Sequence, residues 1–233
     1  MNPDNEIEAN NLLDLYINKI NLDNINFIIA PPAVYLRELF LKLSKLNNNK
    51  IFLSAQNISW ETKGAFTGEI SAASCKSIGA EFSIIGHSER RKYNQETDEL
   101  IAKKFVIAVN AGLMPIICVG ESKIEFDNNK TGDVLSKQLE FLKVNKNLKF
   151  LIAYEPIWSI GSGASADADY IAKVINYIKN NIFNNSENIK ILYGGSVNAA
   201  NAQSIFSIAN LDGVLIGGAS LDIGQLIGIC NNK

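Results

Sequence analysis

Short runs of apolar, β-branched residues recur along the chain, and stretches with helical spacing separate them. Seven runs are nearly continuous in apolar character, as strands buried on both faces should be. They cover residues 26–32, 50–57, 82–88, 114–122, 149–156, 189–196 and 212–220. Apolar positions at helical spacing lie between them, for example over 33–46, 96–112 and 167–183. This alternation predicts a parallel sheet, either doubly wound or closed into a barrel.

Length and loop composition favour the barrel. Glycine-bearing polar loops follow nearly every strand of the 233-residue chain, and no linker or low-complexity segment divides it, so we expect a single domain over residues 1–233. The predicted fold is an α/β (β/α)₈ barrel, the TIM-barrel architecture, with its site at the carboxyl ends of the strands. Such a barrel needs eight strands and seven are visible, so the first strand is expected to precede the opening helix.

The first residues predict a helix. Asn2 suits the N-cap and Pro3 the first helical position. An apolar stripe at helical spacing follows, formed by Ile7, Leu12, Leu15 and Tyr16.

Composition narrows the classes of partner and compartment. A net charge of −2 gives no reason to expect nucleic acid or an anionic membrane as partner. No apolar run approaches the roughly 20 residues of a membrane span, and the N-terminus lacks the regions of a signal peptide. Cys75, Cys118 and Cys230 are odd in number and share no close spacing, which indicates reduced, packed thiols and a cytoplasmic location.

Two side chains at strand ends are candidates for chemistry. His87, the single histidine, follows the run ending "IIG" and precedes "SERR"; it is either a packing residue or a neutral hydrogen-bond donor at a helix start. Glu155 lies near the end of the run "LIAYEP", just before Pro156. It is either a loop cap or ion-pair partner, or a general base whose pKa is raised by partial burial.

Glycine pairs follow each of the last three strands, at 161–163, 194–196 and 217–220. Because glycine lets backbone N–H groups approach an anion closely, and barrels commonly bind phosphate after their last strands, these loops predict a phosphate site. The segment "IWSIGSGASAD" joins a stiff aromatic start to a flexible centre. It is typical either of a hinged lid or of an ordinary surface loop.

Three other kinds of site agree less well with the sequence. "GSGASA" (161–166) lacks the acidic ribose partner of a dinucleotide site. "GHSER" (86–90) has Arg90 where a nucleophile elbow needs glycine. One histidine and scattered cysteines make a zinc site improbable, and we expect no metal and no cofactor.

Together these segments resemble the triosephosphate isomerase family. "IIGHSERR", "AYEPIWSIGSG", "YGGSV" and "IGGASL" are similar to its signatures in order and spacing, and "AQN", "GAFTGE" and "ICVGE" are similar to its strand-end and loop segments. The resemblance covers essentially all of residues 1–233. It implies a TIM barrel that interconverts dihydroxyacetone phosphate and glyceraldehyde 3-phosphate through an enediolate, in glycolysis and gluconeogenesis.

The resemblance also implies residue roles. Glu155 is the base, His87 the neutral electrophile and Glu89 a supporting carboxylate, while Cys118 packs beside the base. The phosphate-binding positions are Gly161, Ser196, Gly217 and Gly218. The lid covers 156–166, including Pro156, Ile157, Trp158 and Gly163, and Tyr193 and Ser196 latch it. The loop "GAFTG" (64–68), with Thr67, is similar to the one that a family homodimer inserts into its partner.

The sequence departs from the family at two places. Ala164 stands where the lid usually carries lysine. The family also has a first strand ending in Asn-x-Lys just before a Met-Asn helix start, and this sequence begins at that Met. The lysine of that segment is a preorganised charge, and loss of one such charge typically costs about 10²–10³ in rate. We therefore expect weak activity of the chain as written, and dimerisation only when that strand is present.

Two other functions can be compared with the residues present. A non-catalytic phosphate-binding barrel would need neither His87 nor Glu155. Another phosphosugar enzyme, such as a lyase, would need a Schiff-base lysine at a strand end, and none is visible.

Overall fold

A curled sheet of seven parallel strands forms the centre of the molecule. The computed structural model describes residues 2–46, 48–145, 147–160, 165–184, 186 and 188–233. Within these ranges the strands follow one another in chain order, and each pairs in parallel with the next. They are β1 (Phe27–Ile29), β2 (Ile51–Ala55), β3 (Phe82–Ile85), β4 (Met114–Val119), β5 (Leu151–Tyr154), β6 (Lys190–Tyr193) and β7 (Gly213–Val214).

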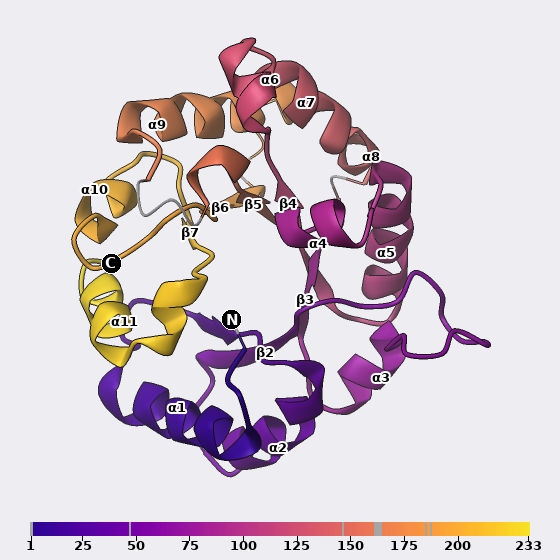
Figure 1. The fold of residues 1–233 in the computed structure, drawn as a ribbon, viewed down its shortest axis with the longest axis vertical. Coiled ribbons are helices and arrows are strands. Elements are labelled where there is room, and N and C mark those ends of the chain that lie inside the picture. The colour runs from indigo at the N-terminus through magenta and orange to yellow at the C-terminus, as the bar shows by residue number, and fades with distance from the viewer. Residues whose placement is uncertain (1, 47, 146, 161–164, 185, 187) are drawn as a thin grey trace.

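Helices surround the sheet on its outer side, except that the short helix α4 (Ser88–Tyr93) lies inside this ring (Figure 1). They are α1 (Glu6–Lys19), α2 (Ala33–Leu43), α3 (Ala72–Ser77), α4 (Ser88–Tyr93), α5 (Asp98–Asn110), α6 (Lys123–Asp127), α7 (Thr131–Gln138), α8 (Glu140–Lys143), α9 (Ala168–Tyr177), α10 (Ala202–Phe206) and α11 (Ile223–Cys230). Short turns of other helix types are η1 (Ile157–Ser159), η2 (Ile178–Ile182) and η3 (Gly218–Leu221). The predicted alternation of strand and helix is confirmed. The sequence showed it because strands buried on both faces need apolar residues at nearly every position.

The two faces of the sheet pack differently. Ile84 pairs with Ile116, and both point into the curl together with Cys118 and Ala153. Their neighbours Ile85 and Ile117 point outward into the larger core beneath the helices. The period of two along a strand therefore divides each apolar run between an inner cluster and an outer core.

The curl is open between its first and last strands. Among the described residues β1 pairs only with β2, and β7 only with β6. α1 and α11 lie side by side across this opening (Figure 1), where Tyr16, Ile20 and Leu226 form a small cluster. The Tyr16 hydroxyl donates to the carbonyl of Ser220, which ties α1 to η3.

A cavity of about 1910 Å³ occupies the inside of the curl. It runs the length of the strands, because its lining includes Met114 and Lys190 at strand starts and His87 and Glu155 beyond strand ends.

The start of α1 differs from its prediction. Asn5, rather than Asn2, is the N-cap, and its side chain accepts from the Glu8 backbone N–H at 2.9 Å. Asn2 instead accepts a hydrogen bond from Gln56 at 3.0 Å. An N-cap residue directly precedes the first residue of its helix. Because α1 begins at Glu6, Asn2 lies too early in the chain to cap it and contacts Gln56, 54 residues away, instead.

The buried face of α1 also differs. Ala9, Leu13 and Tyr16 are buried, whereas Ile7 is 73% exposed and Leu15 is 37% exposed. The apolar stripe predicted from Ile7 and Leu15 is therefore wrong, although Leu12 and Tyr16 do pack against α11. In the part of the chain that the structure describes, no helix combines the length and apolarity needed to cross a membrane.

Candidate active site

His87 lies at the carboxyl end of β3, where the chain turns into α4. Gly86 makes this turn with a φ of +73°, a left-handed conformation that favours glycine. The imidazole Nδ1 then accepts a hydrogen bond from the Glu89 backbone N–H at 3.3 Å. Because an accepting ring nitrogen carries no proton, this contact assigns a neutral ring with its proton on Nε2.

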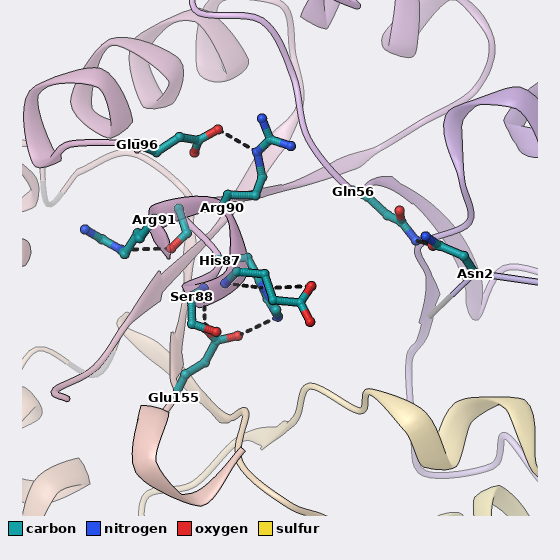
Figure 2. Close-up of polar contacts among 10 residues, drawn as sticks. Asn2, Gln56, His87, Ser88, Arg90, Arg91, Glu96 and Glu155 are labelled. Carbon is teal, nitrogen blue, oxygen red and sulfur yellow. Dashed lines mark hydrogen bonds and ion pairs between the residues drawn. The ribbon is translucent and has the colours of Figure 1, made fainter. Parts of the chain in front are cut away.

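Glu155 follows β5 and faces His87 (Figure 2). The side chain is buried, and its Oε2 accepts from the Ser88 backbone N–H at 3.0 Å. Its Oε1 lies 3.2 Å from His87 Nε2, but the pair lacks hydrogen-bond geometry and Oε1 has no hydrogen-bond partner among the described residues. The arrangement holds one carboxylate oxygen and leaves the other available beside the imidazole.

Burial sets the electrostatics of this pair. It raises the pKa of Glu155 above its usual value of 4.5, while the hydrogen bond from the Ser88 N–H partly offsets the effect. Cys118 lies in contact with the carboxylate, and burial and the nearby charge of Glu155 raise the pKa of its thiol well above the usual value. A carboxylate with a raised pKa is a stronger base than a solvated one, and Cys118 stays protonated beside it.

Glu121 was not identified as a functional residue from the sequence. It is fully buried after β4, and its carboxylate accepts from three side chains. These are the Tyr154 hydroxyl at 3.1 Å, the Trp158 indole N–H at 2.9 Å and the Tyr170 hydroxyl at 2.9 Å. A carboxylate directly after an apolar strand was the available signal, but its donors lie 33 to 49 residues away.

Arg91 was also missed. Its guanidinium donates to the carbonyl of Gly86 at 2.9 Å and to that of Cys118 at 3.1 Å, and it pairs with Asp98 at 2.7 Å. The side chain therefore joins the end of β3, just before His87, to the end of β4.

The segment expected to form a lid begins on η1. Pro156 is buried, and Ile157 and Trp158 follow it on this short turn, with the indole held by Glu121. At the far end of the segment, the Ala166 backbone N–H donates to the Tyr193 hydroxyl at 3.3 Å. The expected positions Gly161, Gly163 and Ala164 lie outside the described residues.

The glycine loops after β6 and β7 line the same cavity as His87 and Glu155. Ser196, Gly217 and Gly218 all contribute to this lining, and Cβ atoms at the two glycines would meet open space. At Gly194 a Cβ would lie 2.8 Å from the Glu155 Cγ. The loop after β6 therefore packs directly against the carboxylate.

Two expected residues are exposed rather than buried like Glu155. The Glu89 carboxylate is 67% exposed, and its Oε2 lies 3.8 Å from His87 Nδ1. Thr67 is exposed on the loop between β2 and α3, which projects from the body of the molecule (Figure 1). Nowhere in the described ranges do three or more His, Cys, Asp or Glu side chains group as a metal site would require.

Comparisons with known proteins agree with this geometry. The family model described as "Triosephosphate isomerase" matches residues 1–233. Curated relatives with the same description come from Escherichia coli O1:K1 / APEC, E. coli K12 / DH10B and Shigella boydii serotype 18. Each is 45% identical over 201 residues, a match that covers 83% of this chain and 78% of the relative.

Proposed function

The chain belongs to the triosephosphate isomerase family, and on that premise we propose that Glu155 and His87 carry out its isomerisation. The substrate is a small phosphorylated triose, and the reaction moves one proton between adjacent carbons. The observation that carries the proposal is the buried Glu155 Oε1, which lies beside a neutral imidazole and has no hydrogen-bond partner among the described residues.

Each residue has a defined role. Glu155 Oε1 removes the proton from the carbon next to the carbonyl and returns it to the neighbouring carbon. His87 donates its Nε2 proton to the carbonyl oxygen, where negative charge develops, and the same nitrogen then takes the proton of the neighbouring hydroxyl, so that the ring ends neutral and the carbonyl has moved to the adjacent carbon. Glu89 supports the imidazole through its backbone N–H, which fixes the tautomer. Its carboxylate lies beside the same nitrogen.

The phosphate group is proposed to bind on the loops after β6 and β7. Ser196, Gly217 and Gly218 line the cavity there, and backbone N–H groups at glycines suit an anion. Gly161 is assigned to the same role by family resemblance. Residues 156–166 close over the substrate, with Tyr193 holding their far end, and exclude water from the enediolate.

We also propose that residues 1–233 form one domain, that two copies pair through the loop carrying Thr67 when the family's first strand is present, and that the protein is cytoplasmic. One continuous sheet supports the first proposal. The exposure of Phe66 and Ile70 on that loop supports the second. The free cysteines at 75, 118 and 230 support the third.

The test is isomerisation of the two triose phosphates in deuterated water. Proton transfer through an enediolate predicts solvent deuterium in the product, and E155Q should lower kcat by about 10²–10⁴-fold, the usual contribution of a general base. H87Q should lower kcat as well. Isomerisation without deuterium uptake, or an E155Q variant as fast as the parent, contradicts the proposal. Phosphate binding without turnover would instead favour a non-catalytic barrel.

A further inference from the structure

Gln138, the last residue of α7, makes a paired contact with the backbone of Gly120. Its side-chain Oε1 accepts from the Gly120 N–H at 2.9 Å, and its Nε2 donates to the Gly120 carbonyl at 3.1 Å. The amide thus satisfies both polar groups of a single residue beyond the end of β4.

Gly120 in turn lies against the backbone of Glu155. A Cβ atom at residue 120 would overlap the carbonyl oxygen of Glu155. Any shift of Gly120 toward β5 therefore displaces Glu155 directly, because close-packed interiors transmit strain.

The residues on either side of Gly120 hold the chain around Glu155. The Glu155 N–H donates to the Val119 carbonyl at 2.7 Å, and the Ile157 N–H donates to the Glu121 carbonyl at 3.1 Å. Residues 119–121 thus form a shelf for residues 155–157. The polar groups of Gly120, the middle residue of this shelf, bond to Gln138 instead.

We propose that Gln138 is a positioning residue for the isomerisation, acting through Gly120 to fix where the backbone of Glu155 sits. This inference rests on the proposed role of Glu155 and extends it to a residue 17 positions earlier in the chain. α7 supplies a firm anchor, because Leu135 on the same helix is fully buried in the core. The side-chain amide of Gln138 bonds to Gly120, and Gln138 is not one of the described residues that line the cavity.

The primary test is an NMR titration that does not depend on turnover. The ¹³C carboxyl signal of Glu155, assigned by its loss in E155Q, is followed with pH in the parent and in Q138M. Methionine keeps the length of glutamine and removes both hydrogen bonds. Release of the shelf should admit water and shift the Glu155 midpoint downward, since burial is the largest cause of its raised pKa. His87, Cys118 and the Ser88 N–H face the same carboxylate, so their contacts are checked in the same spectra.

Kinetics provide the second readout. Misplacement of a reacting group by a remote change can cost about 10²-fold, so Q138M should lower kcat by about 10- to 100-fold. Its KM should stay within about twofold of the parent's value, because the proposed phosphate-binding loops follow β6 and β7 and not β4. The matched control is Q203M, at an exposed glutamine on α10, which should leave the titration and both kinetic constants unchanged. If Q138M does not fold, Q138E replaces it, since it keeps the length but sets a carboxylate oxygen against the Gly120 carbonyl.

The two proposals fail in different ways. A folded Q138M with the parent's Glu155 midpoint and kcat overturns the role of Gln138 and leaves the proposed function intact. A lower melting temperature alone, with an unchanged titration, shows a structural role only and also overturns it. An E155Q variant that isomerises as fast as the parent overturns the proposed function, and with it the catalytic meaning of this inference.

Discussion

Glu155 illustrates a conflict between stability and function at a single residue. A buried carboxylate is costly unless it is hydrogen-bonded, yet among the described residues only one oxygen of Glu155 has a hydrogen-bond partner. The unpartnered oxygen is the one proposed to accept the substrate proton. The fold therefore tolerates an unfavourable group where the chemistry requires it.

This conflict predicts a pH-dependent stability difference between the parent and E155Q. Because the folded-state pKa of Glu155 is raised above the usual value of 4.5, its contribution to stability is greatest below that usual value and is lost as pH rises through the folded value. The glutamine of E155Q does not titrate in this range. Its free energy of unfolding should therefore increase relative to that of the parent as pH rises from about 4 to the folded pKa of Glu155.

Urea unfolding of both proteins across this pH range measures the effect. E89Q is the control, because the Glu89 carboxylate is largely exposed, and it should show no comparable trend. A stability difference between E155Q and the parent that is constant with pH would contradict the buried-carboxylate account.

At the scale of elements, α1 shows how a helix start depends on where the chain comes from. Both Asn2 and Asn5 have the side chain that an N-cap needs. Asn5 has the extended backbone of a cap, with φ −154° and ψ 171°, and bonds to Glu8. Helix α1 packs with α11 over the opening between β1 and β7, so its stability bears on that side of the sheet.

We expect N5A to lower the free energy of unfolding by about 0.5–2 kcal/mol, the usual cost of losing a cap. N2A is the matched control, since it removes an exposed contact to Gln56 and should change the free energy by less than about 0.5 kcal/mol. Chemical denaturation of the two variants measures both values. A larger loss in N2A than in N5A would place the cap at Asn2 after all.

At the scale of the whole molecule, the projecting loop between β2 and α3 is preorganised. Trp60 packs edge-on against Phe66 with ring centroids 6.0 Å apart, while Phe66 and Ile70 remain 39% and 40% exposed. A loop that holds its own shape loses little entropy when it docks. This supports its proposed role in pairing two copies of the chain.

Sedimentation at several protein concentrations tests the pairing. F66D should shift the protein toward monomer, because a charge at a buried interface is costly without a partner. V144D is the control, since Val144 is 86% exposed at the end of α8, outside that loop, and it should leave the association unchanged. A protein that includes the family's first strand and stays monomeric at every concentration contradicts the proposed dimer.

The sequence by itself determined the order of strands and helices and the placement of the chemistry at strand ends. Continuous apolar runs predict buried parallel strands, and His87 and Glu155 could be found because each directly follows such a run. These are local signals, repeated along the chain and independent of which elements become neighbours. The same local pattern failed at α1, where Asn2 and Asn5 both suit a cap and the face turned to the core depends on α11.

Only the tertiary structure decided which polar groups meet. It brought Tyr154, Trp158 and Tyr170 to Glu121, and Gln138 to Gly120. In the part of the chain that the structure describes, it left Glu155 Oε1 beside His87 without a hydrogen-bond partner. No period along the sequence encodes these contacts, because each joins side chains from different elements. Burial, and with it the raised pKa of Glu155, arises from packing around the group. The neighbours that cause it become defined only when the sheet has curled and brought the strand ends together.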